Sequence, residues 1–144
     1  MKASLLFPAL AALAVSASGT ARGETSPGRV EVVLTVTVEN SRGRVLCGVY
    51  ERDGWLKRPL KATPASIRGN TASCRFGGLK PGTYAAGAFQ DTNSNGRLDR
   101  NWMGLPREPW CVTRGSRGRL SAPSFASAAF SVRDEPVRLS CRAS

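Results

Sequence analysis

Residues 91–99 carry the residue types best suited to chemistry in this sequence. Counted from Asp91, side-chain oxygens stand at positions 1, 3, 5 and 9, and a glycine stands at position 6. An EF-hand calcium loop has this spacing, because alternate residues turn oxygen ligands towards the ion and the glycine allows a sharp bend. The predicted ligands are the side chains of Asp91, Asn93, Asn95 and Asp99 and the backbone carbonyl of Arg97.

The loop departs from the full calcium pattern, and a second interpretation stays open. Position 12, a bidentate glutamate in the full pattern, is Trp102 here. The direct ligand set is short unless Glu108, Asp134 or Glu135 folds back, so the expected affinity lies near the roughly 10⁻⁴–10⁻³ M of extracellular modules. The alternative is a tight turn without metal, since Asn-Gly is itself a hairpin signal and Asp and Asn side chains bond to their own backbone.

The sequence contains no histidine, and this absence excludes several kinds of active site. Ser-His-Asp and Cys-His nucleophile systems, histidine-ligated zinc and imidazole acid–base chemistry all need that residue. A hydrolase built on two carboxylates is a third functional class, but Asp91 and Asp99 are the only close pair in a suggestive motif, and their setting suits an ion better. We therefore expect a protein that is not an enzyme.

The first 21 residues have the order of a secretory signal peptide. Lys2 precedes an apolar run over residues 5–15, and small residues follow up to Ala21. The run is shorter than the roughly 20 apolar residues that span a bilayer, so an uncleaved anchor is the weaker alternative. Cleavage after Ala17 or Ala21 fits. We expect a secreted or periplasmic protein without a transmembrane segment in the mature chain, organised as a signal peptide over 1–21, a polar lead-in over 22–29 and one domain over 30–142.

Four cysteines follow the signal, and an even number in an exported chain indicates two disulfides. A four-cysteine metal site is the rival, but the sequence has no CxxC pair. Side-chain alternation places Cys47, Cys74 and Cys141 on the inward side of strands. We favour the pairs Cys47–Cys74 and Cys111–Cys141, and the other pairings stay open.

The mature chain is predicted to be all-β. Residues 30–39 give the strongest strand signal, because they are rich in β-branched residues and alternate in polarity from Leu34 onward. Turn residues at 40–43 are expected to join this strand to a second one at 44–50 as a hairpin. Further strands are predicted at 65–68, 71–76, 83–90, 128–132 and 136–141, with one long irregular loop over about 91–123.

Six or seven short strands without a predicted helix favour a single antiparallel β-sandwich. A small β-barrel is the alternative. Removal of 21 residues from 144 leaves 123, which is enough chain for one core and too little for two ordinary domains.

Several motifs together are similar to a known family. They are residues 79–84 (LKPGTY), 88–99 (AFQDTNSNGRLD) and 104–108 (GLPRE), continued by 123–125 (PSF) and 128–130 (AAF). In this order they resemble the secreted bacterial family named domain of unknown function 2141, over about residues 32–139. The resemblance implies a small exported β-sandwich, prealbumin-like or immunoglobulin-like, with no known catalytic activity, and it strengthens the calcium interpretation. Cys111 departs from the family, so the two disulfides are expected to be local to this chain.

The chain is strongly basic, with a formal net charge of +11 at pH 7. Arg114, Arg117 and Arg119 cluster in a Gly- and Ser-rich segment and suit attraction to lipid headgroups, acidic polysaccharide or nucleic acid. The alternative is a solvated surface, since charge alone gives only salt-sensitive, non-specific attraction. Because no recognition helix or aromatic-basic RNA motif is present, no specific nucleic-acid partner is expected.

Apolar and aromatic residues crowd the irregular segment at Trp102, Met103, Leu105 and Trp110. Together with Trp55 they could form an exposed platform that binds sugar rings or a partner protein. The commoner alternative is that such residues pack a long loop against the edge of the sandwich. The sequence as a whole predicts a non-catalytic secreted or periplasmic β-sandwich module, with Ca²⁺ as its one candidate cofactor. The alternative is a binder of anionic cell-surface polymers or membrane surfaces through an arginine-rich face.

Overall fold

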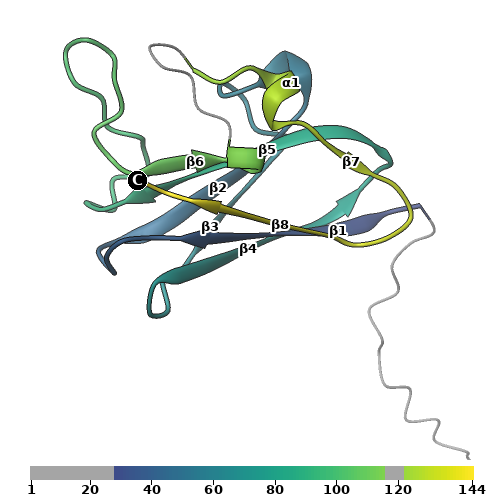
Figure 1. Cartoon of the computed structure of the whole chain (residues 1–144), viewed down its shortest axis with the longest axis horizontal. Helices are drawn as coiled ribbons and strands as arrows, with labels where there is room; N and C mark the ends of the chain where they lie inside the picture. The colour runs from purple at the N-terminus through teal and green to yellow at the C-terminus, as the bar shows by residue number, and fades with distance from the viewer. Residues whose placement is uncertain (1–27, 116–121) are drawn as a thin grey trace, which may run out of the picture.

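The computed structural model describes residues 28–115 and 122–144, and these form two layers of β-strands (Figure 1). One sheet has the strand order β4-β1-β8, and the other has the order β3-β2-β5-β6, with β7 also paired to β5. The predicted all-β sandwich is therefore confirmed. The strands are β1 (Val30–Thr37), β2 (Arg44–Tyr50), β3 (Lys61–Ala65), β4 (Thr71–Leu79), β5 (Gly82–Asp91), β6 (Trp110–Val112), β7 (Phe130–Val132) and β8 (Val137–Arg142).

The strands of the described residues differ from the prediction in several details. A short strand, β6, forms inside the segment predicted to be irregular; three residues are too few for a polarity pattern to show. β8 pairs with β1 in parallel, whereas the other strand pairs are antiparallel. Residues 66–68 are not a strand, because β3 begins and ends earlier, where it pairs with β2.

The predicted hairpin of the first two strands is wrong. β1 pairs with β4 and β8, and β2 pairs with β3 and β5, so the connection between them crosses from one layer to the other. Buried Gln90 of β5 donates from Nε2 to the carbonyl oxygens of Asn40 (3.0 Å) and Arg42 (2.7 Å). These bonds satisfy backbone carbonyl groups of the connection, which in a hairpin would accept hydrogen bonds from the neighbouring strand.

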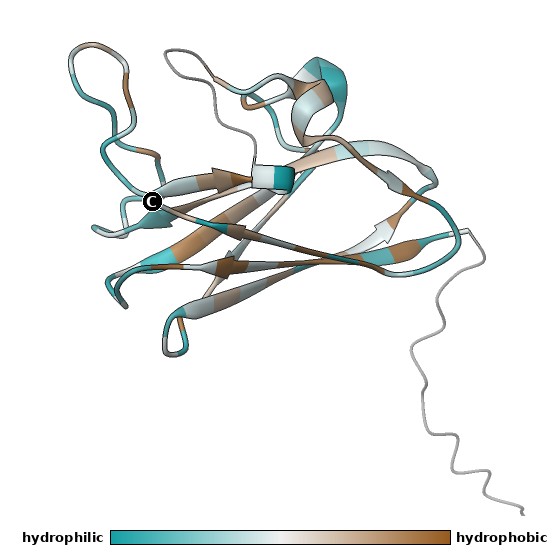
Figure 2. Ribbon diagram, in the orientation of Figure 1, coloured by the Kyte–Doolittle hydropathy of each residue, from teal (hydrophilic) through white to brown (hydrophobic). Residues whose placement is uncertain are grey.

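Apolar side chains, most of them valines, fill the space between the layers. The fully buried side chains of Leu34 and Val36 on β1 belong to the same core cluster as Val45 and Val49 on β2. Both strands therefore turn one apolar face inward, as the alternation of their side chains requires. Figure 2, in which hydrophobic residues are brown, shows brown stretches along these strands.

Two disulfides cross the core and join the two sheets. One links Cys47 of β2 to Cys74 of β4, and the other links Cys111 of β6 to Cys141 of β8. This is the pairing that the sequence analysis favours among the three possible ones. Each bridge closes a loop of the unfolded chain, and such bridges commonly stabilise a domain by about 2–4 kcal/mol.

Short helical turns cover one end of the five-stranded sheet. They are η1 (Arg52–Gly54), η2 (Thr113–Gly115) and α1 (Phe125–Ala128), which replaces the first part of the strand predicted at 128–132. Trp55, which follows η1, donates from Nε1 to the carbonyl of Pro123 at 2.7 Å and packs edge-on against Phe125. Among the described residues, no helix has the length and apolarity to cross a membrane.

Candidate functional site

The loop predicted to bind calcium begins at a buried carboxylate. Asp91 ends β5, and its Oδ1 and Oδ2 accept the backbone N–H groups of Asn95 (3.1 Å) and Gly96 (2.9 Å). Gly96 has a φ of 78°, so the sharp bend expected at that glycine is present. Arg44 of β2 lies 3.5 Å from Asp91 Oδ2 and balances its charge. The loop is thereby folded back on its own first residue.

The other three predicted side-chain ligands meet one another in this loop. Asn93 Nδ2 donates to Asp99 Oδ2 at 2.6 Å, and Asn95 Nδ2 donates to Asp99 Oδ1 at 2.8 Å. These two hydrogen bonds, from Asn95 first and then Asn93, hold the pKa of Asp99 below its usual value, because they favour the charged carboxylate. The same two hydrogen bonds close the loop. The described residues contain no cluster of three acidic, histidine or cysteine side chains arranged for a metal.

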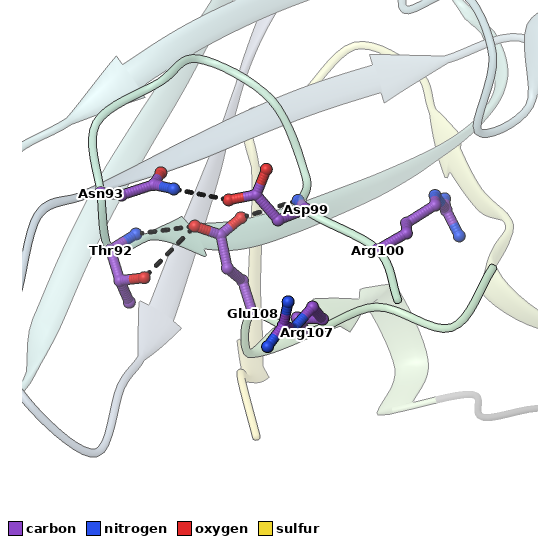
Figure 3. Close-up of a pocket in the computed structure, with 6 residues that line it drawn as sticks. All are labelled: Thr92, Asn93, Asp99, Arg100, Arg107 and Glu108. Atoms are coloured by element: carbon purple, nitrogen blue, oxygen red, sulfur yellow. Dashed lines mark hydrogen bonds between the residues drawn. The ribbon is translucent and has the colours of Figure 1, made fainter. Parts of the chain in front are cut away.

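Glu108 folds back onto this loop and ties its two ends together. Its Oε1 accepts the backbone N–H of Thr92 at 3.0 Å and the Thr92 hydroxyl at 3.3 Å, and its Oε2 accepts the backbone N–H of Asp99 at 3.0 Å. Figure 3 shows the Glu108 carboxylate between Thr92 and Asp99, in a polar pocket of about 400 Å³ that Arg100 and Arg107 also line. From the sequence, Glu108 is one of three acidic residues that could complete an ion site. In the structure its carboxylate instead binds the backbone at both ends of the loop, an arrangement called the Glu108 clamp below.

A larger groove lies on the outer face of the five-stranded sheet. Its volume is about 720 Å³, and its one charged lining residue in the described chain is Arg100. Gly48 of β2 stands opposite Gly87 of β5 in the floor of this groove, and neither position has a side chain. Apolar side chains surround this floor on the strands and the loops, namely Leu46, Leu56, Phe89, Leu98, Met103, Leu105, Trp110 and Val112.

Tyr50 supplies a polar group to the lining of the groove. An added Cβ at Gly48 would lie 2.9 Å from the Tyr50 hydroxyl oxygen, so the tyrosine ring rests over the glycine on the same strand. The hydroxyl makes no hydrogen bond to another described residue, and burial raises the pKa of Tyr50. Sequence reasoning missed this groove. The sequence feature that could have indicated the groove is a glycine in the middle of each of two strands. Such a glycine often marks a site where a ligand or another backbone approaches the sheet closely.

The cluster of aromatic residues in the long loop divides into two groups. Trp55 and Trp110 are half-buried and hold the loops against the sheet, which matches the commoner of the two expectations. Trp102, Met103 and Leu105 are instead 93%, 59% and 43% exposed. For these three residues the expectation that they pack the loop against the sandwich is wrong.

The arginine cluster is described only in part. Arg114 is exposed, and its Nη1 donates to the carbonyl of Ala129 at 3.3 Å. Arg117 and Arg119 lie outside the described residues. The structure therefore places one member of the predicted anion-binding set.

Comparison with known proteins gives one match. The model of a family described as an uncharacterized protein conserved in bacteria (DUF2141) matches residues 33–140. No match was found among curated proteins or among solved structures. The matched segment contains the whole Asp91–Asp99 loop, the Cys47–Cys74 disulfide and nearly all of the sandwich, and it ends one residue before Cys141. The chain therefore belongs to the DUF2141 family.

Proposed function

We propose that this protein is an exported, non-catalytic β-sandwich module that binds an apolar small molecule on the outer face of its five-stranded sheet. The observation that carries this proposal is the groove of about 720 Å³ above Gly48 and Gly87. Small-molecule sites commonly have volumes of about 300–1,000 Å³, apolar walls and a few polar groups that fix orientation. The groove has these properties, with Tyr50 and Arg100 as its polar groups.

Two features support the export part of the proposal. The segment with signal-peptide order lies outside the described residues, so its support comes from the sequence alone. The two disulfides between the sheets are typical of proteins that fold in an oxidising compartment such as the periplasm or the cell exterior.

The absence of catalysis is supported by what the buried carboxylates do. Asp91 and Glu108 each accept two backbone N–H groups, so these carboxylates are engaged in holding a loop. A general base must instead have its oxygen free to reach a substrate proton. The chain also has no histidine for this work.

A second candidate function is calcium binding by the Asp91 loop. It is supported by the meeting of Asn93 and Asn95 with Asp99 within hydrogen-bond distance. Rotation of the two amides would turn their oxygens to an ion that Asp91, Asp99 and the Arg97 carbonyl would also contact. An added 5 mM Ca²⁺ should then raise the melting temperature relative to chelator, and Asn93→Ala should abolish the rise. No shift in the parent protein would remove this candidate.

The alternative interaction with anionic polymers or membrane surfaces through Arg114, Arg117 and Arg119 is supported by the net charge of +11 and by the exposure of Arg114. Salt-sensitive retention on immobilised heparin that falls in the triple Arg→Gln variant is its expected result. Retention that is unchanged in this variant would assign the attraction to other arginines.

The groove is tested by titration with N-phenyl-1-naphthylamine, a neutral dye that fluoresces in apolar sites. We expect saturable binding to the mature protein. Gly87→Leu should weaken it at least tenfold, because an added Cβ at Gly87 finds ordinary contacts of 3.5 Å and the rest of the side chain fills the groove. The matched control is Gly77→Leu on β4, where an added Cβ finds open space. Absence of saturable binding, or equal losses in both variants, would contradict the proposal.

A further inference from the structure

We propose that residues 101–105, here called the apolar tip, insert into the surface of an anionic lipid bilayer. Met103 and Leu105 of the tip also line the binding groove, whereas Trp102 does not, and the inference does not depend on the proposed function. It starts from the exposure of apolar side chains at the end of the long loop, which projects from the sandwich as the green loop in Figure 1.

Exposed apolar residues are concentrated at this tip. Five large apolar side chains are exposed in the described residues, and Trp102, Met103 and Leu105 are three of them, within four consecutive positions. Trp102 is the most exposed, at 93%. In Figure 2 the projecting loop includes a stretch coloured as hydrophobic. A contiguous apolar patch of this kind marks a site of interaction with a protein or a membrane.

The backbone of the tip is held in shape by its own hydrogen bonds. Asn101 Oδ1 accepts the N–H groups of Met103 (2.9 Å) and Leu105 (3.0 Å), and the Asn101 backbone bonds to Leu105 and to Gly104. The Gly104 carbonyl accepts Nη1 of Arg100 at 2.9 Å. Lipid offers no partners to exposed backbone groups, so a segment that enters it must satisfy them internally. The tip meets this requirement at four of its N–H groups.

The charges around the tip select an anionic surface. Arg97, Arg100 and Arg107 are exposed on the segments that lead to and from it. Two carboxylates, those of Asp99 and Glu108, lie beside the three arginines, so the base of the tip keeps a positive balance of charge. Basic residues beside an exposed tryptophan are the combination that anionic membrane interfaces attract, because the indole ring lies at headgroup level and the arginines bind the headgroup charge.

The test uses the mature protein and vesicles of phosphatidylcholine with or without 30% phosphatidylglycerol. We expect co-sedimentation with the anionic vesicles only, and quenching of tryptophan emission when the lipids carry brominated acyl chains. Trp102→Ser should lower the vesicle partition coefficient at least tenfold and remove the quenching. The double variant Arg97→Gln/Arg107→Gln should lower the partition coefficient and flatten its salt dependence.

The matched control is Leu60→Ser, which removes another exposed apolar side chain (47% exposed) on a different loop and should leave vesicle binding unchanged. Retained binding of N-phenyl-1-naphthylamine, or an unchanged circular dichroism spectrum if the dye does not bind, shows that Trp102→Ser is folded. The inference is overturned if the parent protein does not bind anionic vesicles, or if Trp102→Ser and Leu60→Ser bind them equally. Trp102-dependent binding to a soluble oligosaccharide or protein without vesicle binding would also overturn it.

Discussion

Gly43 approaches the backbone of Asp91 so closely that an added Cβ at Gly43 would lie 1.9 Å from the Asp91 carbonyl oxygen. Gly43 also has a φ of 65°, a conformation that favours glycine. The connection between the two sheets is thus fitted against the start of the Asp91 loop, and the order of that loop depends on a residue 48 positions earlier in the chain.

This contact gives the first prediction. Gly43→Ala should lower the free energy of unfolding by about 2–4 kcal/mol, because the strain of a positive φ adds to a clash with backbone. Gly69→Ala is the matched control, since Gly69 has the same φ of 65° but open space around its missing Cβ, and it should cost only about 1 kcal/mol. Urea denaturation measures both values. Equal losses in the two variants would show that the Asp91 contact is unimportant.

The clamp made by Glu108 gives the second prediction. Glu108→Ala leaves the N–H groups of Thr92 and Asp99 without their carboxylate acceptor, and this should lower the free energy of unfolding by about 2–3 kcal/mol. Glu135→Ala, at an exposed carboxylate of the β7–β8 turn, should change it by less than about 0.5 kcal/mol. Hydrogen exchange should show faster opening at Thr92 and Asp99 in the first variant alone. Unchanged exchange at these two amides would refute the clamp.

A third prediction concerns pH. The Asp99 pKa is lowered on folding, so its carboxylate contributes stability above the unfolded value of 3.8, and this contribution is lost as pH falls through the lower folded pKa. Asp99→Asn should therefore melt below the parent at pH 7, and the difference should shrink between pH 4 and pH 2. Differential scanning calorimetry measures both proteins across this range. A difference in melting temperature that is constant with pH would contradict the assignment.

The fourth prediction isolates the Tyr50 hydroxyl. Tyr50→Phe should change the free energy of unfolding by less than about 0.5 kcal/mol, because the hydroxyl makes no hydrogen bond to another described residue. It should weaken a groove ligand with a carbonyl acceptor, such as the dye Prodan, by about fivefold, the equivalent of one hydrogen bond of about 1 kcal/mol. N-phenyl-1-naphthylamine, which has no carbonyl, serves as the control ligand. Equal effects on the two dyes would show that the hydroxyl does not orient the ligand.

Much of the fold could be predicted from local patterns in the sequence. Alternation in residues 30–39 and 44–50 identifies β1 and β2, and the inward parity of Cys47, Cys74 and Cys141 agrees with the disulfides that form. The partner of each strand could not be predicted in this way. The turn residues at 40–43 fit a hairpin and a crossing between sheets equally well, and the choice depends on Gln90, which lies 48 residues beyond Arg42.

The candidate sites show the same division between local and distant information. The Asp91 loop is local, so its bend at Gly96 and the gathering of Asn93, Asn95 and Asp99 follow from spacing. The groove brings together residues from β2, β3, β5, β6 and three connecting segments, and no single stretch of sequence contains it. The exposure of Trp102 was equally hidden, because an aromatic residue in a loop has the same sequence whether it is buried or exposed.

The most direct test of the account is to map the bound ligand on the protein by NMR. Amide chemical shifts of the ¹⁵N-labelled mature protein would be followed during titration with N-phenyl-1-naphthylamine. We expect the largest saturating shifts at Gly48, Gly87 and Val112, which line the groove. Saturating shifts confined to the β4-β1-β8 sheet, or no saturating shift at any residue, would contradict it.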